Sequence, residues 1–209
     1  LILRKGAIRI GVLNYTYGTN GLKAQKPTSV NYIDTKTMRL DIEKSKLENL
    51  DQLIVITHWG LEYQTSPNKS QIKVAEFLLD NGADMVIGGH PHVIQKAIWR
   101  KEKNQLVAFS LGNFVSNQAS VNTDGGMMLE LTLVKNEDNI EIKNPGYHLI
   151  WVHKPNVNGK KIYEIIPCNL YENDTTIMNA TNNSKMNLFI KNARKIMSQN
   201  ENIPEVQLH

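Results

Sequence analysis

Two short apolar runs separated by a helical stretch constrain the fold more than any other feature of this 209-residue chain. Residues 53–57 (LIVIT) and 85–87 (MVI) are continuously apolar, which is typical of strands covered on both faces. Between them, Ser66-Pro67 predicts a helix start and Asn81-Gly82 predicts its end. This order predicts a β-α-β unit with two parallel strands and a right-handed crossover.

The remaining sequence continues a mixed α/β pattern. Further strands are predicted at residues 1–3, 7–13, 106–110, 127–133, 140–142, 149–152 and 161–166, a loop at 15–21, and further helices at 41–50 and 185–198. In the first of these helices, Ile42 and Leu47 are expected to face the core. Turn residues at 144–146 (NPG) and 158–159 (NG) predict two chain reversals, and residues 199–209 are expected to fray.

Composition limits the partners that the chain is expected to bind. The formal net charge is +4, and the basic residues are not interleaved with aromatic ones, which argues against a nucleic-acid groove. The single cysteine, Cys168, excludes an internal disulfide and lies in an apolar run, so we expect a buried thiol. No run reaches the ~18 to 20 apolar residues of a membrane span. The chain opens at Leu1 in strand-like sequence, and we expect it to belong to a longer protein.

Three histidines follow the two predicted parallel strands. His58 comes directly after the first strand, and His90 and His92 come after the second, in the sequence GGHPH. Ligands bind beyond the carboxyl ends of such strands, so the three imidazoles are expected to meet at one edge of the sheet. Imidazole nitrogen suits Zn, Mn, Fe and similar ions, which predicts a metal site. The other histidines show no such pattern and are expected to be structural or surface residues: His148, His153 and His209.

Two polar residues on the same predicted edge are candidates for the surroundings of the site. Glu62, four residues after His58, is expected either to supply or orient a metal ligand or to be an exposed loop residue. Asn113 ends another predicted strand and is a candidate for orienting a bound group, although Gly-Asn turns are common without function. Trp59 and Phe114 are expected to pack around the site.

Six stretches of the chain occur in a fixed order and spacing: 14–21 (NYTYGTNG), 30–34 (VNYID), 56–63 (ITHWGLEY), 83–95 (ADMVIGGHPHVIQ), 109–118 (FSLGNFVSNQ) and 123–131 (TDGGMMLEL). Together they resemble the CapA-like family of bacterial capsule-synthesis proteins, which is associated with poly-γ-glutamate. The resemblance covers roughly residues 7–167, and its most specific segments are HWG-x-EY, GGHPH and SLGNF.

The resemblance implies a calcineurin-like metallophosphoesterase fold, an α/β/β/α sandwich, with a pair of divalent ions such as Mn, Zn or Fe. Matched motif to motif, His58 and His90 would serve one ion and His92 the other. It implies as partners an anionic polymer or its precursor and capsule-synthase components at the membrane, and no nucleic acid. It also implies a location in the cell envelope, extracytoplasmic or anchored through a preceding N-terminal segment.

The chain departs from the family pattern at its start. Family members supply further ligands from an N-terminal half: an early Asp motif, a bridging carboxylate and an Asn-His pair whose His assists catalysis. None of these appears before Gly6, so we expect about half of a two-metal site, with the catalytic residues in that other half. The expected division is a partial metallophosphoesterase-like domain at 1–134, its strand-rich completion at 135–168, and a polar linker with an amphipathic helix at 169–209.

Three functions remain open from the sequence. The first is a metal-dependent hydrolase of the phosphoesterase type, active when the full-length chain is present. The second is a non-catalytic surface factor that binds the polymer or scaffolds the capsule-synthesis machinery, for which a lysine-rich surface would favour an acidic polymer. The third is a structural zinc site, which needs four closed ligands, and only Glu62 is a candidate for the fourth.

Overall fold

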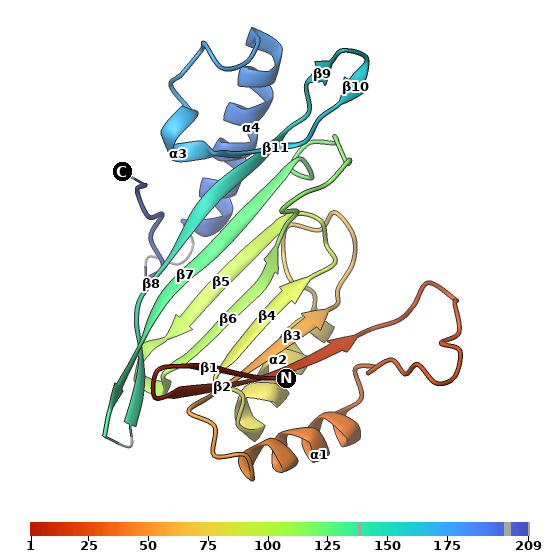
Figure 1. Ribbon diagram of the computed structural model, residues 1–209, viewed down its shortest axis with the longest axis vertical. Helices are drawn as coiled ribbons and strands as arrows, with labels where there is room; N and C mark the ends of the chain where they lie inside the picture. Colours follow the sequence, from red (N-terminus) through yellow and green to blue (C-terminus); the bar gives the residue numbers. More distant parts are fainter. Residues whose placement is uncertain (138, 199–201, 209) are drawn as a thin grey trace.

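A six-stranded sheet positions the predicted histidine edge (Figure 1). The computed structural model describes residues 1–137, 139–198 and 202–208. The strands of this sheet, in the spatial order β1-β2-β3-β4-β6-β5, are β1 (Ile2–Lys5), β2 (Ile8–Thr16), β3 (Gln52–His58), β4 (Met85–Gly89), β6 (Gln105–Leu111) and β5 (Ile94–Arg100). The four strands β2, β3, β4 and β6 are parallel, and the two edge strands are antiparallel. The predicted parallel pairing across the β-α-β unit is therefore confirmed.

Two helices cover one face of this sheet. They are α1 (Thr35–Lys46) and α2 (Lys69–Asn81), and they bury alternate strand residues such as Val55 and Val86. The predicted start of α2 at Ser66-Pro67 is wrong, because Asn68 is the N-cap and forms a capping box with Gln71. The predicted end is confirmed at Gly82, whose φ of 118° closes the helix.

The first helix differs from its prediction at both ends. It begins after Asp34, whose side chain accepts a hydrogen bond from the Thr37 amide, rather than at residue 41. Ile42 is buried as predicted, but the prediction for Leu47 is wrong: this residue is the C-cap and is 82% exposed. Because α1 ends at Lys46, the Leu47 side chain does not lie on the buried face of the helix.

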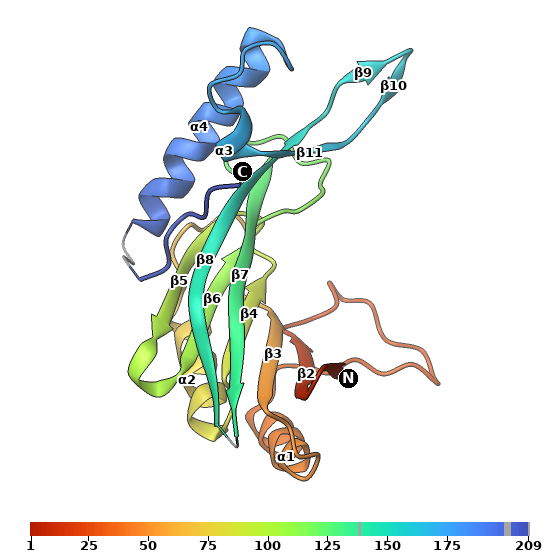
Figure 2. The same cartoon turned by 60° about the vertical axis from the view of Figure 1, so that its left-hand side comes forward.

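A second, three-stranded sheet packs on the other face of the large sheet, as Figure 2 shows. Its order is β11-β8-β7, with β7 (Gly125–Asn136), β8 (Asn139–His153) and β11 (Glu164–Pro167). The predicted reversal at 144–146 is wrong, because β8 continues through these residues opposite an irregular register at Glu130 and Thr132. The predicted Asn158-Gly159 hairpin is confirmed between β9 (Asn156–Val157) and β10 (Lys160–Lys161).

The C-terminal part adds helices at one end of the sheets. These helices are α3 (Cys168–Tyr171) and α4 (Ala180–Met197), and α4 packs against β5 and β8. Earlier in the chain, a 3-10 turn, η1 (Lys101–Lys103), joins β5 to β6. Cys168 is buried as predicted, and burial raises the pKa of its thiol. Fraying is wrong for the described part of 199–209, because Ile203 is buried and the Val206 amide donates to the Tyr147 carbonyl. Residues 199–201 and 209 lie outside the described residues.

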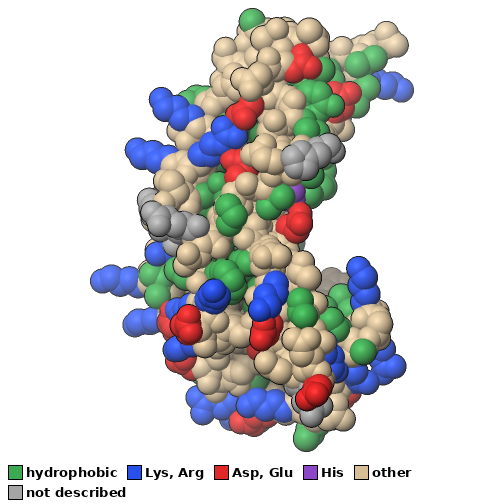
Figure 3. Space-filling view, turned by 90° about the vertical axis from the view of Figure 1, so that its left-hand side faces the viewer, with side chains coloured by type: hydrophobic (Ala, Val, Ile, Leu, Met, Phe, Trp, Pro, Cys, Tyr) green, Lys and Arg blue, Asp and Glu red, His purple; other side chains and the backbone are tan. Residues whose placement is uncertain are grey.

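The predicted α/β class with two packed sheets is confirmed by this arrangement. The molecule is elongated, and the segment between β2 and α1 projects away from the body (Figures 1 and 2). On the face shown in Figure 3, basic side chains lie at both ends with acidic ones among them, so they form no single basic patch on that face. None of the described helices is long and apolar enough to span a membrane.

Candidate metal centre

The carboxyl ends of the parallel strands β3 and β4 bring the predicted histidines together, and β2 lies beside them. Thr16 at the end of β2 lies opposite His58, and His58 at the end of β3 lies opposite Gly89. The ring centroids of His58 and His90 are 4.5 Å apart, and those of His90 and His92 are 6.0 Å apart. The expected convergence is thus present in the structure, while the metal-binding role of the three residues stays a prediction.

Glu62 lies beside two of these histidines. One possible ligand atom from each of Glu62, His90 and His92 lies within 4.8 Å of the others. The Glu62 Oε1 atom is 3.8 Å from His92 Nε2. His58 is not a member of this group, but its ring lies next to the ring of His90. Glu62 is also an exposed loop residue, so both interpretations of Glu62 stay open.

The loop that carries His90 and His92 has an unusual backbone. Their φ angles are 97° and 61°, in the left-handed region that residues with a Cβ atom rarely adopt. Such conformations cost roughly 1 to 3 kcal/mol each and persist where the surroundings enforce them, often at functional sites. The two preceding glycines differ in their roles: at Gly88 a Cβ atom would collide with Phe109 O and Trp59 Nε1, whereas Gly89 has open space.

Asn113 fixes the orientation of His92. The Asn113 Nδ2 atom donates to the Thr123 carbonyl at 2.8 Å, so the Oδ1 atom must face His92 as an acceptor. It lies 3.0 Å from His92 Nδ1, which must therefore carry the proton. In the neutral form of the ring, this leaves the Nε2 lone pair on the side that faces Glu62, which is the tautomer that a metal ligand needs.

Burial also favours neutral imidazoles at this edge. It lowers the pKa of His58, and the nearby His92 acts in the same direction. Burial likewise lowers the pKa of His90, with smaller contributions in that direction from His58 and His92, partly opposed by Glu62. A neutral imidazole keeps a lone pair for a metal ion, so the lowered pKa values of His58 and His90 favour the form that can bind one.

Two tyrosines at the site were missed by sequence reasoning. The Tyr17 ring stacks on His58 at 5.8 Å between centroids, with 9° between the planes, and lies 4.6 Å from His90. The Tyr63 ring stacks on His92 at 6.1 Å, and the Tyr63 amide donates to the Pro91 carbonyl at 2.7 Å. The position of Tyr17 directly after β2 was the available signal, because β2 neighbours β3.

A cavity of about 560 Å³ opens beside His58. It is lined by Asn14, Ile56, Thr57, His58, Ile87, Gly88, Gly89, Leu111, Gly112, Phe114, Met127 and Met128. Trp59 is buried behind the site, and its Nε1 atom donates to Phe109 O at 2.9 Å. Phe114 is about half exposed at the cavity wall. The cavity is therefore an open pocket with the His58 imidazole in its lining.

The remaining described histidines lie in the second sheet. The His148 Nε2 atom is 2.6 Å from Glu130, and the His153 Nδ1 atom is 2.9 Å from Glu164. Both side chains are buried, and among the described residues neither belongs to a group of possible metal ligands. Their contacts fit the structural role expected for them, and His209 lies outside the described residues.

Fold and site together define an α/β protein with a histidine-rich pocket at the carboxyl edge of a parallel sheet. The family described as bacterial capsule synthesis protein PGA_cap matches residues 1–118, and the chain belongs to this family.

Two curated relatives carry matching descriptions. The capsule biosynthesis protein CapA of Bacillus anthracis is 32% identical over 127 residues, which cover 61% of this chain and 25% of the relative. The PGA biosynthesis protein CapA of Bacillus subtilis (strain 168) is 35% identical over 89 residues, which cover 43% of this chain and 23% of the relative. The chain therefore spans about a quarter of the length of these relatives.

Two solved structures are similar at low sequence identity. A hypothetical protein from Thermus thermophilus has a TM-score of 0.46 and 15% identity, covering 70% of this chain and 60% of that chain. The sulfate thiohydrolase SoxB of Thermus thermophilus, in complex with glycerol, has a TM-score of 0.43 and 14% identity, covering 95% and 29%.

Proposed function

We propose that the histidine pocket is part of a divalent-metal centre, and that the complete capsule-synthesis protein is a metal-dependent hydrolase in the cell envelope. Its substrate would be a phosphoester or amide-like bond in an anionic polymer or its precursor. One observation carries the proposal: the Asn113 Oδ1 atom lies 3.0 Å from His92 Nδ1, so His92 directs Nε2 toward Glu62, beside His90 and His58. Such an arrangement suits a metal ion better than it suits packing.

The residues of this chain have distinct parts in the proposal. His58, His90 and His92 would hold Mn, Zn or Fe ions, with Glu62 as an oxygen ligand or an acceptor from a ligand. A bound divalent ion supplies Lewis acidity for hydrolysis. Asn113 orients His92, and the rings of Tyr17 and Tyr63 stack on His58 and His92.

The ligand count requires further groups. Two-metal hydrolysis uses ions about 3.5 to 4 Å apart that contact both the attacking and the leaving oxygen. Among the described residues, the pocket offers three imidazoles and only one nearby carboxylate, Glu62. In this proposal, a polypeptide segment outside residues 1–209 supplies the bridging carboxylate and any catalytic histidine.

An apolar cavity gives that segment a place to pack. The cavity has a volume of about 810 Å³ and lies between the two sheets, with walls from β2, β3 and β4 on one side and β7 on the other. It shares Ile87 and Leu111 with the cavity beside His58. A strand or helix placed there would bury apolar surface and bring its end close to the imidazoles.

Turnover by the full-length protein tests the proposal. Hydrolysis of an anionic polymer or a phosphoester is expected to require added metal, and His90→Ala should lose both metal and turnover. His148→Gln is the matched control, because it changes a paired histidine of the second sheet. Full, metal-independent turnover in His90→Ala would reject the hydrolase.

A non-catalytic polymer-binding role is the second candidate, because the chain carries a net charge of +4 and basic side chains at both ends of the face in Figure 3. Retention of the polymer by a variant that lacks His58, His90 and His92, without turnover in the wild type, would favour it. A closed structural zinc site fits less well, because the Glu62 side chain is 49% exposed.

A further inference from the structure

Residues 123–126, with the sequence TDGG, form a tightly packed segment at the start of β7 that holds Asn113 in place. The Asn113 backbone N–H donates to the Gly125 carbonyl at 3.0 Å, and the Asn113 side chain donates to the Thr123 carbonyl at 2.8 Å. A Cβ atom at Gly126 would lie 2.7 Å from Asn113 O, so the two backbones pack without room for a side chain. The position of Asn113 is therefore set by this segment.

Asp124 fastens the same segment to strand β8 at two points. Its Oδ2 atom accepts a hydrogen bond of 2.9 Å from Trp151 Nε1, and its carbonyl accepts one of 2.7 Å from the Val152 backbone N–H. Asp124 is 6% exposed and Trp151 is 3% exposed, so the side-chain contact is shielded from water, which strengthens it. Thr123, the neighbour of Asp124, is thereby held at a fixed position relative to β8.

Stability alone does not account for a carboxyl group at this position. Burial raises the pKa of Asp124, although the Trp151 hydrogen bond opposes the shift. The Asp124 Oδ1 atom is buried and has no hydrogen-bond partner among the described residues. An unpaired buried polar atom destabilises the folded state, and departures of this kind are expected at functional positions.

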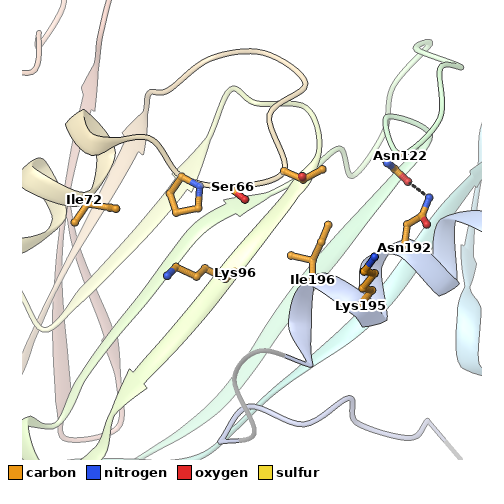
Figure 4. A pocket seen from close by; sticks show the side chains of 9 residues that line it. Ser66, Ile72, Lys96, Asn122, Asn192, Lys195 and Ile196 are labelled. Atoms are coloured by element: carbon orange, nitrogen blue, oxygen red, sulfur yellow. Dashed lines mark hydrogen bonds between the residues drawn. The ribbon is translucent and has the colours of Figure 1, made fainter.

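Helix α4 holds the loop before β7 from another side. The Asn192 Nδ2 atom donates to Asn122 Oδ1 at 2.8 Å, and Figure 4 shows these two side chains directed toward one another from α4 and from the loop. Asn122 directly precedes Thr123, whose backbone N–H and hydroxyl both donate to the Ser120 carbonyl, at 3.0 and 2.9 Å. The direction of the Thr123 carbonyl is therefore fixed from several sides.

We propose that Asp124 is a positioning residue for His92. By binding Trp151, Asp124 keeps the Thr123 carbonyl in place. This carbonyl orients the Asn113 side chain, whose Oδ1 atom, 3.0 Å from His92 Nδ1, keeps the proton of the neutral ring on that nitrogen. The second sheet thus selects the tautomer of an imidazole at the edge of the first. Only the consequence for metal affinity rests on the proposed function.

Nitrogen NMR of the histidine rings in the metal-free 209-residue chain tests the proposal, because the chemical shifts of the two ring nitrogens report which one carries the proton. In mildly alkaline solution the wild type is expected to show His92 as a single tautomer protonated on Nδ1, with His92→Gln used to assign the signals. Asp124→Ala should give a mixture of both tautomers. Asp124→Asn keeps an acceptor for Trp151 and should give the wild-type spectrum.

Two further variants separate positioning from a general loss of stability. Trp151→Phe removes the donor to Asp124 but keeps a buried ring, so it should change the His92 signals as Asp124→Ala does, and it carries the test if Asp124→Ala does not fold. Ile142→Ala is the matched control, because Ile142 is buried at the far end of β8, opposite Leu133. It should lower the free energy of unfolding without changing the His92 signals.

Zinc titration measures the consequence for the candidate metal centre. Asp124→Ala and Trp151→Phe should each weaken Zn²⁺ binding about three- to tenfold, less than a direct partner of the ligand would, because they act through Asn113. Ile142→Ala and Asp124→Asn should bind as the wild type does.

Wild-type His92 signals in the folded Trp151→Phe variant, or the same change in Ile142→Ala, would overturn the proposal. A tautomer change in a chain that binds no Zn²⁺ would support the positioning role and reject the metal centre instead. The two failures are therefore distinguishable.

Discussion

The Nδ1 atom of His92 and the Oδ1 atom of Asn113 lie 3.0 Å apart, and this contact links two loops that follow different strands. His92 follows β4, and Asn113 follows β6, its parallel neighbour. The Asn113 amide is fixed in turn by the Thr123 carbonyl. The orientation of one candidate ligand thus depends on a residue 21 positions away in the sequence.

Replacing Asn113 by alanine is expected to lower metal affinity without removing a ligand. His92 loses the acceptor that holds its proton on Nδ1, and loss of such a partner typically costs about ten- to a hundredfold in affinity. Titration of Mn²⁺ or Zn²⁺ into the variant measures the change. The control is Asn117→Ala, an exposed residue of the same loop that contacts Lys161 and Tyr163 instead. Equal affinities in wild type and Asn113→Ala would show that this contact has no role in metal binding.

The two glycines before His90 give a sharp test of packing behind the site. A Cβ atom at position 88 would collide with Phe109 O and Trp59 Nε1, which are joined by a hydrogen bond of 2.9 Å. We expect Gly88→Ala to lower the free energy of unfolding by about 1 to 3 kcal/mol, as overpacking does. Gly89→Ala should be near neutral, because nothing lies within 4 Å of its Cβ position. Urea denaturation of both variants checks the contrast, and similar losses in both would contradict it.

Two aspartates are expected to give stability changes of opposite sign with pH. Burial raises the pKa of Asp124, although a hydrogen bond from Trp151 opposes the shift. The folded state therefore disfavours its charged form, and the free energy of unfolding should fall as pH rises from the ordinary Asp pKa through the raised one. Asp124→Asn keeps the acceptor for Trp151 and should remove this fall.

Asp51 has a lowered pKa, in contrast to Asp124, and its effect on stability should therefore have the opposite dependence on pH. A hydrogen bond from Lys135, with another from the Arg9 amide, lowers its pKa, so its stabilisation is present above the ordinary Asp pKa and is lost as pH falls through the lowered one. Asp51→Asn should lose stability near neutral pH and little in acid. Urea midpoints between about pH 3 and pH 7 measure both variants, and slopes of the same sign would refute the assignment.

The elements that could be predicted from the sequence are those with local signals. The apolar runs of β3 and β4, with a helix between them, were sufficient to predict parallel strands, and the position of His58 at the end of one strand then predicted its approach to His90. The predicted starts of α1 and α2 differ from the observed ones because the side chains of Asp34 and Asn68 cap these helices. Similar residues nearby are equally good caps by sequence alone.

The parts that were missed depend on distant partners. Strand β5 carries no clear alternation, and it exists because it pairs with β6 in a hairpin. Strand β8 runs through Pro145 because β7 accommodates the irregularity with a shift in register. Tyr17 reaches His58 because β2 pairs with β3, and Tyr63 reaches His92 through the folding of its loop. In each case the tertiary contact decides the outcome.

Metal titration of the wild-type chain and of His58→Ala, His90→Ala and His92→Ala tests the central claim most directly. If the three imidazoles belong to one metal centre, each substitution should weaken Mn²⁺ or Zn²⁺ binding by about tenfold or more, whereas His148→Gln should bind as the wild type does. A wild-type chain that binds neither ion, or three variants that keep wild-type affinity, would contradict the account.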